Sequence, residues 1–73
     1  MNTRHKAPNV LGIFKTGDIL KHVKTGGTYE VIGLATIEAT LAAAYVYKAQ
    51  SNQSLWIRPQ QEMEDGRFVV LNR

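Results

Sequence analysis

Hydrophobic and polar residues alternate along several short stretches of this chain, and turn-forming residues separate these stretches. An alternation with a period of two places one set of side chains on each face of a β-strand. We predict antiparallel strands near residues 18–24, 28–35, 43–49, 54–58 and 67–71, and one helical turn near residues 60–64. The sequence therefore predicts an all-β fold, a small SH3-like barrel of about five antiparallel strands with one short helical turn before the last strand.

Glycine positions support these strand boundaries. Gly26 and Gly27 separate two β-prone runs and can adopt the positive φ angles of a tight hairpin turn. Gly33 lies inside the strand with the clearest pattern, where a glycine often marks a bulge or a sharp bend. We expect the sheet to curl at this position.

Residues 36–50 fit two structures. The alanine-rich segment 38–44 has strong intrinsic helix propensity, and Ile37, Leu41 and Tyr45 fall on one helical face. The adjoining residues Tyr45 and Tyr47 flank a valine and favour a strand. Periodicity alone leaves a helix across residues 37–49 open.

A polar loop at residues 50–53 would set the register of a hairpin that holds the only tryptophan. In this register Tyr47 faces Trp56 and Tyr45 faces Arg58. Period-two alternation then places the candidate ligand-binding residues on one face, and the aliphatic residues on the other face would point into the core. The candidates are Tyr45, Tyr47, Trp56 and Arg58, and the expected core residues of this hairpin are Val46, Leu55 and Ile57.

These four side chains suit two kinds of partner. Exposed aromatic rings stack on unpaired bases, and an arginine binds phosphate or carboxylate through two hydrogen bonds. The same residue types also anchor protein partners. Two structural alternatives exist: this face is the core and the aliphatic face lies outside, or Arg58 only stacks on Trp56 and stabilises the fold.

Length and charge limit the remaining choices. The 73 residues suffice for one domain, and the absence of cysteine excludes disulfides and thiolate metal sites. The net charge of +3 is concentrated at the start of the chain, where residues 1–24 carry five basic groups and one acidic group. We interpret residues 1–9 as a flexible basic tail and residues 10–73 as a single SH3-like domain. No apolar run is long enough to cross a membrane and no signal-peptide pattern is present, so we expect a cytoplasmic protein without a membrane partner.

Residues with catalytic chemistry are sparse. His5 and His22 have no nucleophile or acid at a meaningful spacing, so we interpret both as non-catalytic. Glu62, Glu64 and Asp65 form a small acidic cluster that flanks a turn and offsets nearby positive charge. We expect no enzymatic activity, no metal and no cofactor.

Short motifs lie in a defined order along residues 17–64. They comprise His22 and Lys24; Tyr29, Glu30, Val31, Gly33 and Ala35; Val46 and Tyr47; Leu55, Trp56, Ile57, Arg58 and Pro59; and Glu62 with Met63. Their order resembles a family of small bacterial and phage-associated domains of unknown function, with the pattern H-x-K-G, Y-E-V-x-G-x-A, V-V-Y and L-W-V-R-P. One residue is added before Tyr29 and another before Glu62, and residues 37–40 replace a polar H-S-E-T segment of the family. The resemblance implies a turn near residues 37–42 and a strand at 43–49.

The combined prediction is a small, non-enzymatic binding module. Its expected ligand is RNA, single-stranded DNA or another nucleotide-containing molecule on the Tyr/Trp/Arg face. The alternative is a protein-interaction or homodimerisation module, in which another chain covers that face.

Overall fold

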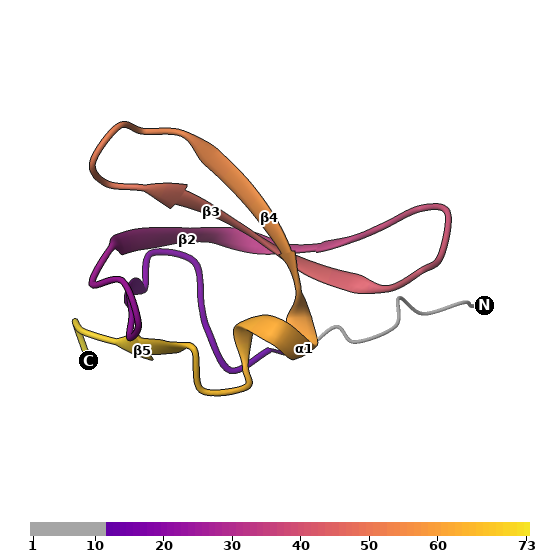
Figure 1. The fold of residues 1–73 in the computed structure, drawn as a ribbon. Helices are drawn as coiled ribbons and strands as arrows, with labels where there is room; N and C mark the ends of the chain where they lie inside the picture. Colours follow the sequence, from indigo (N-terminus) through magenta and orange to yellow (C-terminus); the bar gives the residue numbers. More distant parts are fainter. Residues whose placement is uncertain (1–11) are drawn as a thin grey trace.

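The structure, a computed structural model, describes residues 12–73 and contains one antiparallel sheet with a short helix before its last strand (Figure 1). The elements are β1 (Ile19–His22), β2 (Thr28–Thr36), β3 (Ala43–Ala49), β4 (Leu55–Pro59), α1 (Gln60–Met63) and β5 (Phe68–Val70). The strand order is β4-β3-β2-β1-β5. The predicted all-β fold is confirmed. No pairing among the described residues joins β4 to β5, so closure of the sheet into a barrel stays a prediction.

The ambiguous segment is a turn followed by a strand. The turn closes where Leu41 N–H donates to the Ile37 carbonyl at 2.7 Å, and Leu41 has a φ angle of 62°. The strand β3 pairs with β2 on one side and with β4 on the other. An alanine-rich segment of this length is only marginally helical by itself, and pairing on both edges outweighs its propensity.

The strand β2 contains the expected bulge. Val31 pairs with Tyr47, whereas the next pairing joins Gly33 to Val46, so Ile32 is an extra residue without an opposite partner. A bulge bends a strand and increases its twist. The bulge expected beside Gly33 is therefore confirmed by the register of the sheet.

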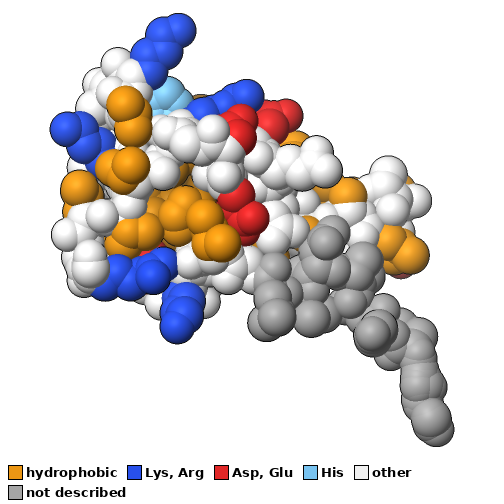
Figure 2. All heavy atoms as spheres, turned by 90° about the horizontal axis from the view of Figure 1, so that it is seen from below, with side chains coloured by type: hydrophobic (Ala, Val, Ile, Leu, Met, Phe, Trp, Pro, Cys, Tyr) orange, Lys and Arg blue, Asp and Glu red, His pale blue; other side chains and the backbone are white. Residues whose placement is uncertain are grey.

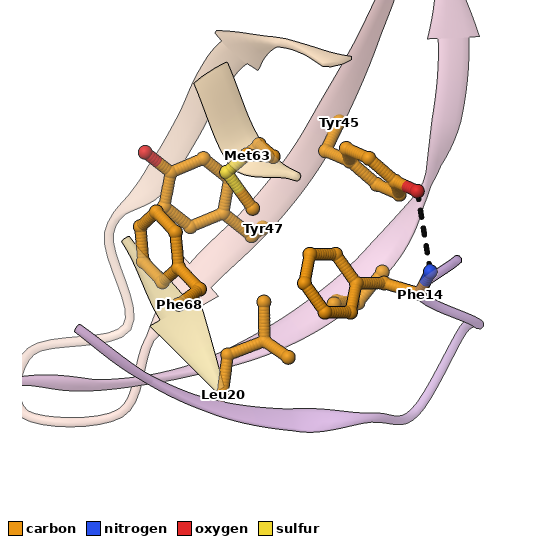
Figure 3. Packing of buried hydrophobic residues seen from close by; sticks show 7 residues of the cluster. Phe14, Leu20, Tyr45, Tyr47, Met63 and Phe68 are labelled. Atoms are coloured by element: carbon orange, nitrogen blue, oxygen red, sulfur yellow. Dashed lines mark hydrogen bonds between the residues drawn. The ribbon is translucent and has the colours of Figure 1, made fainter. Parts of the chain in front are cut away.

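The core lies inside the curve of this sheet (Figure 3). Its buried members are Phe14, Leu20, Val31, Tyr45, Tyr47, Met63 and Phe68. The rings of Phe68 on β5 and Tyr47 on β3 are 5.8 Å apart, although two strands separate β5 from β3 in the sheet. Such a contact requires the sheet to bend around its core, and the ring edges then meet at favourable angles.

The prediction for the aliphatic face of the hairpin was wrong. Leu55 and Ile57 are 65% and 68% exposed, and Val46 is only partly buried. The sheet curls toward the opposite face, so the tyrosines of β3 point inward and β4 presents its leucine and isoleucine to the outside. The alternative, in which the aromatic face is the core and the aliphatic face lies outside, therefore holds for Tyr45 and Tyr47 but not for Trp56, which is 53% exposed.

The two ends of the described chain meet beside β1. The Arg73 guanidinium binds the buried Asp18 carboxylate at 3.0 Å and donates to the Ile13 carbonyl at 2.7 Å. The predicted boundary between a tail at residues 1–9 and a domain from residue 10 lies outside the described residues. The single helix of residues 12–73 is too short to cross a membrane.

Candidate functional site

Tyr45, the first of the predicted site residues, is fully buried and belongs to the core. Its hydroxyl accepts a hydrogen bond from Phe14 N–H at 3.2 Å and donates one to Glu64 Oε2 at 2.6 Å. Burial and the neighbouring Glu64 carboxylate raise the pKa of Tyr45 to about 12. The side chain thus joins the segment before β1 to the end of α1, and it does not meet the other three candidates at the surface.

Those three candidates line one hollow of about 230 Å³, which we call the aromatic hollow. Tyr47, Trp56 and Arg58 contribute from the β3–β4 hairpin. The other side is formed by residues far away in the sequence, namely His22, Thr25, Tyr29 and Phe68. The curled sheet brings these two groups together, because β5 and the end of β1 pack against the concave side of β3.

Aromatic rings form the floor of the hollow. Tyr47 is 4% exposed and Phe68 is 5% exposed, so both are packed from below. The Tyr29 ring lies 5.3 Å from Tyr47 and 5.9 Å from Phe68, both in edge-to-face geometry. His22 meets Phe68 in the same way at 5.0 Å. Edge-to-face pairs stabilise one another, so the floor is a rigid apolar surface.

Trp56 forms an exposed wall of the hollow. The residue is 53% exposed and pairs across the hairpin with Tyr47, in the register that the sequence predicts. Its indole N–H donates to Ser54 Oγ at 2.8 Å, and that hydroxyl donates to Asn52 Oδ1 at 2.6 Å. The loop therefore orients the indole while leaving much of the ring accessible.

Arg58 supplies the positive charge beside the hollow. Its Nε–H donates to the Tyr47 hydroxyl at 3.4 Å and its Nη1 donates to Glu62 Oε1 at 3.1 Å. The Tyr47 contact, with a further contribution from Glu62, raises the pKa of the Arg58 guanidinium above its ordinary value. Glu62 also contacts Arg67 at 3.4 Å, so one carboxylate is shared between two guanidinium groups. A bound anion would compete with Glu62 for Arg58.

The predicted acidic cluster is dispersed among different partners. Glu62 pairs with the two arginines, Asp65 binds Arg67 at 3.0 Å, and Glu64 accepts hydrogen bonds from Tyr45 and Gln60. Within residues 12–73 there is no group of three or more metal-ligating side chains placed to hold an ion. These contacts give the three carboxylates structural roles.

A second and larger hollow, of about 420 Å³, lies beside α1. Its lining consists of Ala42, Ala43, Pro59, Gln60, Gln61 and Glu64. The only ionisable group in this lining is Glu64, whose Oε2 already accepts hydrogen bonds from Ile13, Tyr45 and Gln60. The lining of this larger hollow contains neither an aromatic ring nor a positive charge, so the aromatic hollow is the better candidate despite its smaller volume.

Comparison of the chain with protein-family models, curated proteins and solved structures finds no match. The candidate site therefore depends on its own geometry. Sequence reasoning missed His22, Tyr29 and Phe68 as residues of the hollow. Tyr29 is the second residue of a predicted strand and Phe68 lies in the last one, but their position opposite Trp56 follows only from the curl of the sheet.

Proposed function

We propose that this domain is a non-enzymatic binding module whose aromatic hollow takes one base of a single-stranded RNA or DNA. The observation that supports it is the convergence of Tyr47, Trp56 and Arg58 on a concave surface with three further rings. At about 230 Å³ the hollow is smaller than the roughly 300–1,000 Å³ of pockets that enclose drug-sized ligands. One flat ring fits such a volume better than a whole nucleotide cofactor.

The exposed indole provides the stacking surface in this proposal. Stacking of a base on an aromatic side chain contributes about 1–3 kcal/mol, and it requires a ring that is accessible and held in one orientation. Trp56 meets both requirements through its exposure and its hydrogen bond to Ser54. Arg58 would contact a phosphate after exchanging Glu62 for it, since a guanidinium binds both anions in the same planar geometry.

The test uses the fluorescence of Trp56, which is the only tryptophan in the chain. Titration with a short single-stranded RNA should quench this fluorescence, and Trp56→Ala should abolish binding measured by RNA anisotropy. Because the side chain is half exposed, Trp56→Ala should lower the unfolding free energy by only about 1–2 kcal/mol, less than the 3–5 kcal/mol of a buried aromatic residue. The matched control is Leu55→Ala, which truncates a similarly exposed residue on the other face of β4 and should leave binding unchanged.

Variants at the charged side of the hollow test the role of Arg58. Arg58→Ala should weaken binding and reduce the slope of log affinity against log salt by about 0.7, the value for one contact with a single strand. Glu62→Gln should strengthen binding, because it removes the carboxylate that competes with phosphate for Arg58. If neither RNA nor single-stranded DNA changes the fluorescence of Trp56, base binding in this hollow is refuted.

A second candidate function, a protein-interaction or homodimerisation module, is favoured by a different observation. Leu55 and Ile57 are both exposed, and they are neighbours on the outer face of β4. Exposed apolar side chains that adjoin on one element are typical of contact surfaces. Comparing the sedimentation of the purified wild-type chain with that of variants that lack the Leu55 and Ile57 side chains tests this function independently of any nucleic acid.

A further inference from the structure

The strand β4 lies at one edge of the sheet, and no strand among residues 12–73 pairs with its outer side. At the hairpin loop Ala49 N–H donates to the Ser54 carbonyl at 2.8 Å. Hydrogen-bonded pairs recur at every second residue of an antiparallel ladder, so Trp56 and Arg58 bond to β3. The peptide groups of Leu55 and Ile57 consequently point away from β3, toward the open edge.

Within residues 12–73 this edge is only partly protected, because β4 is short and ends in Pro59 but carries no lysine, bulge or covering strand. Natural edge strands carry lysine side chains, bulges or covering loops, which prevent pairing with another chain. On β4 three consecutive side chains are large, apolar and more than half exposed, at 65%, 53% and 68% for Leu55, Trp56 and Ile57. The single charge of the strand, Arg58, points to the concave side and is engaged by Glu62. The opposite edge strand, β5, has only three residues.

Apolar side chains are also prominent elsewhere on the surface. Seen from below the view of Figure 1, hydrophobic atoms gather in the middle of one face with charged side chains around them (Figure 2). A chain of 73 residues buries few large side chains, and a second subunit is a common source of additional burial in so small a domain. A second copy of this chain would offer the same edge strand for pairing.

We propose that β4 pairs with β4 of a second copy, antiparallel and two-fold symmetric, in a register centred on Ile57. This register sets Ile57 opposite Ile57 of the partner subunit. It also sets Trp56 opposite Arg58 of the partner subunit, and Leu55 opposite Pro59 of the partner subunit. The proposal deepens the second candidate function and requires no binding of a base.

The sequence of β4 is complementary to itself in this register. Ile57 and Ile57 of the partner subunit exchange two N–H···O=C hydrogen bonds, but the ladder weakens beyond this central pair, because Pro59 has no N–H for the Leu55 carbonyl of the partner subunit and its own carbonyl caps α1. Each indole meets a guanidinium, an attractive cation–π pair, and no two like charges are opposed. Opposed residues of an antiparallel pair share one face, so Arg58 of the partner subunit would extend the wall of the aromatic hollow at Trp56.

The proposed interface is small. Two strands of five residues fall at the low end of the size range of specific interfaces, where complexes are weak and transient. We therefore expect a dimer that forms as the concentration rises and dissociates on dilution.

Sedimentation equilibrium over a dilution series provides the first test. The mass should rise from 8.2 kDa toward twice that value with concentration, and Ile57→Lys should hold it at the monomer mass. Val69→Lys is the matched control, because Val69 lies on the other edge strand and is 44% exposed. This variant adds the same charge and should leave association unchanged. Circular dichroism confirms that both variants retain the fold. A wild-type chain that stays monomeric at every concentration, or an Ile57→Lys variant that still dimerises, overturns the proposal.

The register is tested with single cysteines, since the natural chain has none. Opposed residues of a hydrogen-bonded pair have Cα atoms about 5.5 Å apart, within the roughly 4.4–6.8 Å that a disulfide spans. Oxidised Ile57→Cys should therefore form a covalent dimer. Leu55→Cys is the control: its two copies would lie about 13 Å apart along the strands and should not crosslink. Crosslinking of Leu55→Cys, or its absence in Ile57→Cys when the wild type dimerises, overturns the register.

Discussion

The hydroxyl of Tyr45 should contribute a large share of the stability of this domain. Tyr45→Phe removes its hydrogen bond to the Glu64 carboxylate, and a bond to a charged group contributes about 1.5–3 kcal/mol. The same change leaves the N–H of the buried Phe14 without its acceptor, a loss of about 1–3 kcal/mol. The two effects share one atom and are not fully additive, so we expect a loss of about 3 kcal/mol. For a domain of this size that loss corresponds to roughly 12–24 °C in melting temperature.

Thermal and urea denaturation followed by circular dichroism would measure this difference. The control is Tyr29→Phe, because the Tyr29 hydroxyl makes no hydrogen bond to any residue between 12 and 73 and its ring packs against the core cluster that contains Tyr45. This control should change the unfolding free energy by less than about 0.5 kcal/mol. Equal melting temperatures for Tyr45→Phe and the wild type would refute the reasoning that Tyr45 joins Phe14 to Glu64.

Two further predictions concern pH and backbone strain. The pKa of Asp18 is lowered by the Lys15 N–H and Arg73 against the opposing effect of burial, and the pKa of Glu64 is lowered by Tyr45, Gln60 and Ile13, which outweigh its burial. The stabilising contribution of these two carboxylates is therefore complete above pH values near 3.8 and 4.5 and is lost as the pH falls. The contribution of Tyr45 is complete below pH 10 and is lost as the pH rises to about 12. Denaturation at a series of pH values checks both limits. Leu41→Gly should raise stability by about 0.5–1 kcal/mol, because Leu41 has a φ of 62° and is 58% exposed, and a lower melting temperature would contradict this.

The strands and the hairpin register could be predicted because they depend on local information. Alternation along several short stretches and the turn residues between them mark the strands, and the four-residue loop between Ala49 and Ser54 favours the register in which Tyr47 faces Trp56. A one-residue shift would move every side chain of β4 to the other face of the sheet. The observed pairing of Tyr47 with Trp56 is therefore a stringent test of the predicted register, and it agrees with the prediction.

The direction in which the sheet curls could not be predicted from the same pattern. On β4 both faces are apolar enough to be buried, with Leu55 and Ile57 on one and Trp56 on the other. The choice is made by residues distant in the sequence, since Phe14 and Phe68 pack against the tyrosines of β3. Alternation identifies which side chains belong together, but it does not say which set meets the rest of the chain.

The same alternation now separates the two proposed surfaces experimentally. The side chains of Trp56 and Arg58 line the aromatic hollow. The side chains of Leu55 and Ile57 lie on the opposite face of β4, and their peptide groups point toward the edge of the sheet. Ile57→Lys should therefore abolish dimerisation and leave the quenching of Trp56 by RNA, measured on the monomer, largely intact. Arg58→Ala should weaken both, because Arg58 would contact a phosphate in one complex and the partner's Trp56 in the other. If Arg58→Ala weakened dimerisation alone, the arginine would belong to the protein interface and the base-binding role of the hollow would lose its anion contact.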